Sequence, residues 1–127
     1  MWKLVNGKLL QTIDTSRIKY KTRISKALLD DLKIMADKNN TYVGYLLENG
    51  FENILKENAI TFDKKNRPKD RVEFRTTCDK ELLERLKKFA KDHQLNLNDV
   101  IEASVAYINT NDVKQESWRY RVEYEGE

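Results

Sequence analysis

Polar and apolar residues follow the same sequence of patterns in two stretches of the chain. Residues 18–24 and 72–78 alternate β-branched or aromatic side chains with polar ones, which is typical of a strand with one buried face. Each stretch is followed by a residue that can cap a helix, Ser25 or Asp79. Apolar residues then recur three and four positions apart, which predicts an amphipathic helix. Its apolar positions are Leu28, Leu29, Leu32, Met35 and Ala36 in one stretch and Leu82, Leu83, Leu86, Phe89 and Ala90 in the other.

A second amphipathic helix follows each first one after a short polar segment. Its apolar positions are Val43, Leu46, Leu47, Phe51 and Ile54, and then Leu97, Val100, Ile101, Val105 and Ile108. Residues 17–54 can be laid on residues 71–108 without a gap, and identical pairs include Arg17 with Arg71 and Thr22 with Thr76. Because the apolar positions stay in register through a strand and two helices, we predict an internal structural repeat.

One strand–helix–helix copy is too small to fold alone. About 40 residues rarely bury a sufficient core, and a lone strand leaves its backbone groups unpaired. We therefore predict a mainly α fold with short β-strands, in which the two copies pair as a pseudo-dimer. Its two strands form an antiparallel ribbon covered by four helices, and the pairing brings Tyr20 and Phe74 of one chain together.

The flanking segments have different patterns. Asn6 and Gly7 stand between short apolar runs, which predicts a hairpin, and residues 117–125 alternate as in a half-buried strand. The two ends can therefore pair into a small sheet. We predict an N-terminal β extension at 1–16, repeats at 17–55 and 71–109, a polar linker at 56–70 and a C-terminal β tail at 110–127.

Composition excludes several classes of function. The 127 residues include one Cys (Cys78) and one His (His93), too few for a disulfide framework or a zinc site. The four glycines are too scattered for a phosphate-binding loop, and no apolar run approaches the ~20 residues of a membrane span. We expect a cytoplasmic protein with no enzymatic activity, no cofactor, no metal and no membrane association.

Each copy resembles the ribbon-helix-helix (MetJ/Arc/CopG-type) DNA-binding family. The segment RVEFRTTCDKELLERLK at 71–87 resembles the family's strand and first helix, and NDVIEAS at 98–104 resembles the start of its second helix. The first copy follows the same plan more loosely. Two features depart from the family. The usual glycine between the helices is replaced by Asn39 and Asn40 or by His93 and Gln94, and one chain carries two copies where most members carry one.

The resemblance implies where DNA would bind. In the family, outward strand side chains enter the major groove and the start of the second helix holds a backbone phosphate. The corresponding strand residues are Arg17, Lys19, Lys21, Arg23, Arg71, Glu73, Arg75 and Thr77. The corresponding phosphate-binding residues are Thr41, Tyr42, Asn96 and Asn98.

The residues themselves leave plainer alternatives open. A two-stranded ribbon fits the major groove, where Lys and Arg donate to guanine, but charges on an exposed strand also prevent aggregation. Amides at a helix start attract phosphate, yet Asn96 or Asn98 can equally be an ordinary cap.

We expect a sequence-preferring, duplex-DNA-binding protein. Its role would be that of a transcriptional repressor or a nucleoid-associated, DNA-organising accessory factor of a bacterial chromosome, plasmid or phage, which can self-associate along DNA. The alternative is a protein-interaction module, antitoxin-like or an adaptor, that acts through the terminal extensions. If alanine at Lys21 and Arg23 leaves the function unchanged while truncation after Thr110 abolishes it, the alternative is correct.

Overall fold

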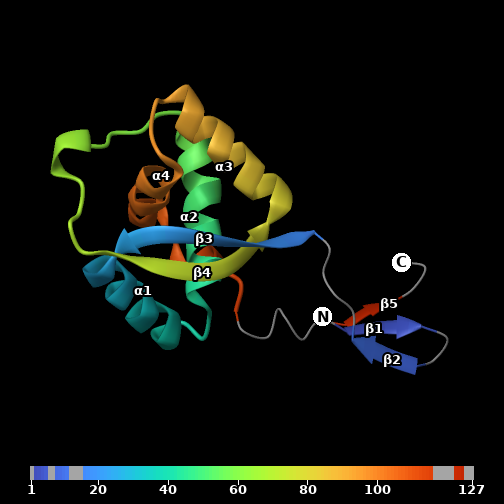
Figure 1. Ribbon diagram of the computed structural model, residues 1–127. Coiled ribbons are helices and arrows are strands. Elements are labelled where there is room, and N and C mark those ends of the chain that lie inside the picture. The colour runs from blue at the N-terminus through green and yellow to red at the C-terminus, as the bar shows by residue number, and fades with distance from the viewer. Residues whose placement is uncertain (1, 6–7, 12–15, 116–121, 125–127) are drawn as a thin grey trace.

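The computed structural model describes residues 2–5, 8–11, 16–115 and 122–124 (Figure 1). In this part of the chain, a strand and two α-helices occur twice in the same order. The first set is β3 (Arg17–Ser25), α1 (Lys26–Lys38) and α2 (Val43–Glu57). The second set is β4 (Arg71–Asp79), α3 (Lys80–Asp92) and α4 (Leu97–Ser104). The prediction of a mainly helical chain with four helices and a two-stranded antiparallel sheet is confirmed.

The predicted capping residues begin the first helix of each set. The side chain of Ser25 accepts a hydrogen bond from the Leu28 amide at 3.4 Å, and that of Asp79 accepts from the Leu82 amide at 2.9 Å. The turn to the second helix needs a left-handed residue, which glycine supplies most easily. Here Asn40 (φ 52°) and Gln94 (φ 58°) take that conformation. The turn therefore forms without the glycine.

Strands β3 and β4 pair antiparallel within one chain. The register runs from Arg17 opposite Asp79 to Ser25 opposite Arg71. Tyr20 faces Thr76 and Thr22 faces Phe74, so Tyr20 and Phe74 are diagonal neighbours on the inward side of the ribbon, as predicted.

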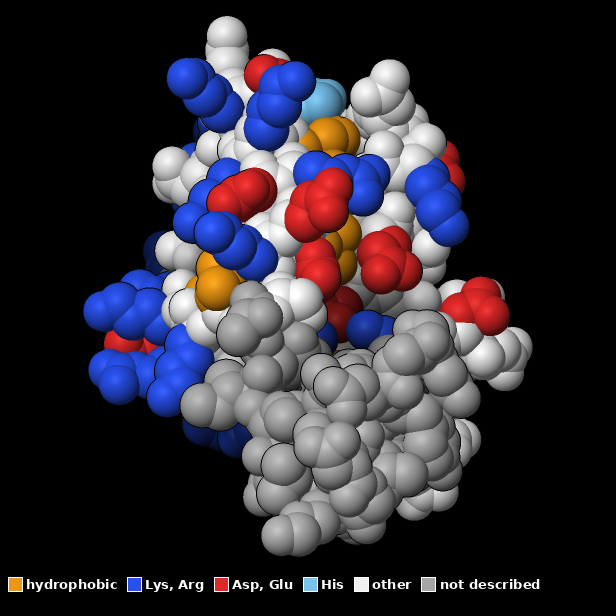
Figure 2. Space-filling model, turned by 90° about the vertical axis from the view of Figure 1, so that its right-hand side faces the viewer, with side chains coloured by type: hydrophobic (Ala, Val, Ile, Leu, Met, Phe, Trp, Pro, Cys, Tyr) orange, Lys and Arg blue, Asp and Glu red, His pale blue; other side chains and the backbone are white. Residues whose placement is uncertain are grey.

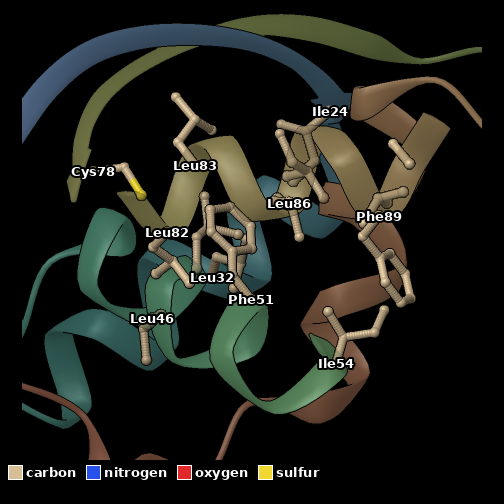
Figure 3. Packing of buried hydrophobic residues seen from close by; sticks show 14 of the residues in the cluster. Ile24, Leu32, Leu46, Phe51, Ile54, Cys78, Leu82, Leu83, Leu86 and Phe89 are labelled. Atoms are coloured by element: carbon tan, nitrogen blue, oxygen red, sulfur yellow. The ribbon is translucent and has the colours of Figure 1, made fainter. Parts of the chain in front are cut away.

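The core lies between the inward side of the ribbon and the helices (Figure 3). Ile24 and Cys78 contribute from the strands, and Leu32, Leu86 and Phe51 from the helices, all at most 1 % exposed. Helix α2 packs against β4 and α4 packs against β3, so the second helix of each copy contacts the strand of the other copy. The two copies are therefore interlocked, and all four helices contact the strands. In Figure 1, α2 and α4 lie behind the ribbon, with α3 above it and α1 below it.

The ends of the chain form a second sheet with strand order β2-β1-β5. Strand β1 (Trp2–Val5) is antiparallel to β2 (Lys8–Gln11) and parallel to β5 (Val122–Tyr124). The prediction that the ends can pair is thereby confirmed. The turn at Asn6 and Gly7, and the rest of the predicted strand at 117–125, lie outside the described residues.

Short 3-10 helices occupy the connecting segments. They span Lys64–Asn66 in the linker, and Val105–Tyr107 and Thr110–Asp112 after α4. Among the helices described, none combines the length and the apolar character needed to cross a bilayer.

Candidate nucleic-acid interface

Six side chains form the outward surface of the ribbon, which we call the ribbon face. It consists of Lys19, Lys21 and Arg23 on β3 with Glu73, Arg75 and Thr77 on β4, and all six residues are exposed. The register places Lys19 opposite Thr77, Lys21 opposite Arg75 and Arg23 opposite Glu73. Figure 2, a side view, shows Lys and Arg side chains gathered along the edge of the molecule where the ribbon lies.

The ribbon face concentrates positive charge. It carries four cations and one carboxylate, and its central pair, Lys21 and Arg75, places like charges directly opposite each other, which destabilises a strand pair. The Glu73 carboxylate lies 3.7 Å from Lys21 Nζ and 3.5 Å from an Arg75 guanidinium nitrogen. Because all three side chains are 45–75 % exposed, solvent screens these contacts. The face is therefore arranged to favour an anionic partner.

Two predicted members of this face, Arg17 and Arg71, do not belong to it. Their side chains are only 15 % exposed and form ion pairs with carboxylates of the second helices. Arg17 binds Glu48, and Arg71 binds Glu102. Burial is the largest single influence and lowers the pKa of each guanidinium, but the hydrogen bonds and the attraction of the neighbouring acidic groups together outweigh it and leave the pKa raised. The prediction that these two arginines belong to the DNA-facing surface is therefore wrong. Each pairs with a buried glutamate, and a buried carboxylate without a cation would strongly destabilise the fold.

Glu48 and Glu102 are site residues that the sequence pattern did not predict. These residues occupy the same position of the repeat, on the side of the second helix that packs against the ribbon, and both are buried. A glutamate at one repeat position among apolar neighbours in both copies is the signal that points to them. The periodicity of the helix alone cannot identify their partners, because Arg17 and Arg71 lie 31 residues earlier in the chain.

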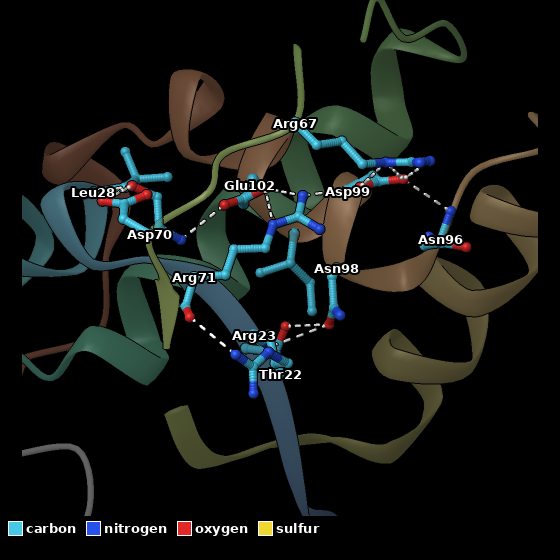
Figure 4. Close-up of polar contacts among 12 residues, drawn as sticks. Thr22, Arg23, Leu28, Arg67, Asp70, Arg71, Asn96, Asn98, Asp99 and Glu102 are labelled. Atoms are coloured by element: carbon cyan, nitrogen blue, oxygen red, sulfur yellow. Dashed lines mark hydrogen bonds and ion pairs between the residues drawn. The ribbon is translucent and has the colours of Figure 1, made fainter. Parts of the chain in front are cut away.

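The second ion pair extends into a network (Figure 4). Asp99 is fully buried and lies 2.9 Å from both Arg71 and Arg67, the latter in the linker. Burial raises the pKa of Asp99, but hydrogen bonds from Arg67, Arg71 and the Asn96 amide outweigh it and keep the pKa below its usual value. Glu102 also accepts from the Ser25 amide at 2.8 Å. The network thus holds the end of β3 and the start of β4 on helix α4.

The predicted phosphate-binding side chains have internal partners. Thr41 is buried and donates to the Lys114 carbonyl, and the Tyr42 ring packs edge-on against Tyr45 at 5.4 Å. Asn96 forms a capping box with Asp99. The Asn96 side chain therefore acts as an ordinary helix cap. A phosphate contact through the backbone amides at the helix starts stays a prediction.

Asn98 joins α4 to the ribbon. Its side-chain oxygen accepts from the Thr22 hydroxyl at 2.7 Å and from the Arg23 amide at 3.2 Å. The start of α4 is therefore fixed directly beside one member of the ribbon face.

Other chemistry-bearing residues have structural surroundings. Cys78 is fully buried, and burial raises the pKa of its thiol to about 12. The ring of His93 lies 4.2 Å from that of Phe89, and its Nδ1 lies 2.8 Å from the Phe89 carbonyl. Within the described ranges, no group of three or more His, Cys, Asp or Glu residues is placed to hold a metal ion.

Comparison with known proteins returns no match to a family model, to a curated protein or to a solved structure. A functional interpretation therefore depends on the ribbon face and the contacts that support it.

Proposed function

We propose that this chain is a tandem ribbon-helix-helix protein that binds duplex DNA with sequence preference by inserting the ribbon face into the major groove. Its role would be that of a transcriptional repressor or a DNA-organising accessory factor. The observation that carries the proposal is the ribbon face itself. Six exposed side chains, four of them cationic, project from a two-stranded sheet whose opposite side is packed against helices.

The dimensions and chemistry of the ribbon face suit the major groove. Paired strands lie about 4.8 Å apart, and the groove is about 12 Å wide, so the pair enters with its side chains. Lys19, Lys21, Arg23 and Arg75 supply donors for guanine O6 and N7. Glu73 supplies an acceptor for the amino group of cytosine, and Thr77 offers a hydroxyl and a methyl group.

The packing behind the ribbon supports recognition. The pairs Arg17–Glu48 and Arg71–Glu102 tie the first residue of each strand to a helix. Hydrogen bonds from the Thr22 hydroxyl and the Arg23 amide to the Asn98 side chain also fix this part of β3 to α4. A ribbon fixed before binding loses little conformational entropy on the DNA, which favours affinity.

Salt dependence and alanine substitution test the proposal. The affinity for a random duplex, measured by fluorescence anisotropy, should fall linearly on a log–log plot against salt, because bound cations release counterions. Lys21→Ala should weaken binding to a selected site by about 1–3 kcal/mol if the side chain contacts a base. Lys88→Ala, at an exposed position of α3, is the matched control and should have little effect. Absence of duplex binding at low salt would contradict the proposal.

The terminal sheet favours a second candidate, a protein-interaction module. In the order β2-β1-β5, strands β2 and β5 are the outer strands, and an outer strand can accept a strand from a partner. Truncation after Gln115 removes β5 but keeps Lys114, which contacts both Glu48 and Thr41. If this truncation abolishes the cellular function while Lys21→Ala and Arg23→Ala do not, the second candidate is correct.

A further inference from the structure

We infer that the DNA core read by the ribbon face is non-palindromic, so that the chain binds it in one orientation. This inference rests on the proposed function and adds the class of site that is recognised. It follows from the strand register together with the residues at equivalent repeat positions.

The register places an approximate twofold axis at the centre of the ribbon. Lys21 and Arg75 occupy the same position of the repeat, since residue 17 corresponds to residue 71, and they lie directly opposite each other. Rotation about the axis between them exchanges β3 with β4. Two identical strands paired in this way would present identical halves and would require a palindromic site.

The residues on either side of the axis are not identical. Rotation exchanges Lys19 with Glu73, which reverses the charge, and Arg23 with Thr77, which removes it. One half of the ribbon face therefore presents Lys19 beside Thr77, and the other presents Arg23 beside Glu73.

The two halves recognise different bases. A carboxylate accepts a hydrogen bond from a base amino group and is repelled by guanine O6 and N7, which Lys and Arg prefer. A base pair that suits Glu73 is therefore a poor partner for Lys19.

The helices beside the ribbon differ in the same way. The first turn of α4 contains the carboxylate of Asp99, and its Asn98 side chain contacts Thr22 and Arg23. The equivalent positions at the start of α2 are Tyr45 and Gly44, and this first turn contains no acidic residue. Asp99 is buried and paired with arginines, so the two helix starts differ in the side chains that surround them rather than by an exposed negative charge. The asymmetry of the ribbon face continues into its flanks.

Site selection with the unmodified chain is the first test. We expect selection from random duplexes to return a core whose halves are not reverse complements. Two palindromes are then made by duplicating each half of that core. Each palindrome places a wrong half-site under one half of the ribbon face, so each should bind roughly 5- to 150-fold more weakly, the range for one good base contact. A selected palindrome centred on one ribbon, or a palindrome that binds as tightly as the selected core, would overturn the inference.

A symmetrised variant is the second test. The substitutions E73K, R75K and T77R give β4 the outward residues of β3, and selection should then return a palindrome. The control E84K/D92N adds the same charge at exposed positions of α3 and should retain the original core. Retention of the original core by the symmetrised variant would contradict the inference.

A single substitution tests the inference without a large change in charge. Glu73→Gln keeps the shape of the side chain and should relax base preference on one side of the core only, whereas equal relaxation on both sides would contradict the inference. If the unmodified chain binds no duplex, the proposed function fails. If it binds a palindrome centred on one ribbon, the proposed function stands and only the inference of a non-palindromic core is contradicted.

Discussion

At the scale of single residues, the same buried ion pair supports each copy of the repeat. Arg17 binds Glu48, and Arg71 binds Glu102, at equivalent positions. Their surroundings differ, because the guanidinium of Arg17 lies 5.4 Å from the centre of the Tyr45 ring, where the second copy has Asp99. A second buried carboxylate requires a second cation, and Arg67 of the linker supplies it. The aspartate at position 99, where the first copy has Tyr45, thus ties the linker to α4 through Arg67.

Removal of one arginine should destabilise the fold. Arg71→Met leaves Glu102 without its arginine and Asp99 with one paired cation, Arg67, and loss of one partner of a buried ion pair costs about 3–5 kcal/mol. Urea unfolding measures the difference. Arg75→Met on the exposed ribbon face is the control and should change the free energy of unfolding by less than about 0.5 kcal/mol. Equal effects of the two substitutions would show that the ion pair at Arg71 contributes nothing.

Acid should weaken the Asp99 network. A carboxyl whose pKa is lowered by folding stabilises the fold above its unfolded pKa of about 3.9, and this stabilisation is lost as the pH falls through the lower, folded value. The free energy of unfolding should therefore decrease between about pH 5 and pH 3. Asp99→Asn should reduce this decrease, because the substituted side chain no longer titrates. If the free energy of unfolding of Asp99→Asn decreases with falling pH as much as that of the unmodified protein, the pH dependence does not come from Asp99.

At the scale of secondary structure, the start of each second helix lies against the strand of the other copy. Asn98 of α4 reaches Thr22 of β3 by a hydrogen bond of 2.7 Å. At the equivalent place, Gly44 of α2 lies so close to Thr76 of β4 that a Cβ atom would be 2.4 Å from the Thr76 hydroxyl oxygen. The same helix–strand contact is therefore made differently in the two places. A side-chain hydrogen bond joins α4 to β3, whereas α2 and β4 pack closely at a glycine.

Gly44→Ala tests the close contact. Alanine is intrinsically better in a helix by about 1 kcal/mol, but overpacking against Thr76 should cost more, about 1–3 kcal/mol. The next nearest atoms lie 3.6 Å away, at ordinary contact distance, so Thr76→Ala should remove the clash. In that background, Gly44→Ala should become neutral or stabilising, as measured by thermal unfolding. If Gly44→Ala lowers the stability equally in the unmodified protein and in Thr76→Ala, the cost does not come from contact with the Thr76 hydroxyl.

At the scale of the whole molecule, the two copies form one interlocked unit within a single chain. Strands β3 and β4 pair with each other, and each second helix packs on the opposite strand. The linker between the copies raises the effective concentration of one for the other to about millimolar. This arrangement supplies within one chain the pairing that a single-copy protein obtains by dimerisation.

Unfolding should therefore be independent of protein concentration. An obligate dimer gains stability on concentration, whereas pairing within one chain does not. We expect one melting temperature over a hundredfold range of concentration and a monomeric mass by analytical ultracentrifugation. A melting temperature that rises with concentration, together with a dimeric mass, would show that the copies pair between chains.

The sequence by itself determined the local elements of this protein. Alternation in 18–24 and 72–78 predicted the strands and the six exposed residues of the ribbon face, because side chains in a strand point to opposite sides in turn. The apolar spacing predicted the helices, and Ser25 and Asp79 predicted where the first helices begin. The repeat predicted that the two strands pair, since neither copy buries a sufficient core alone, and the linker between the copies favoured pairing within one chain.

Only the tertiary structure decided which charges remain exposed. Alternation placed Arg17 and Arg71 with the exposed cations, but packing brought Glu48 and Glu102 beside them, and a buried carboxylate must be paired. The structure likewise assigned Asn98 to the ribbon and set Lys21 opposite Arg75. Local patterns could not show these contacts, because each joins segments more than 25 residues apart, whose alignment depends on how helices and strands pack together.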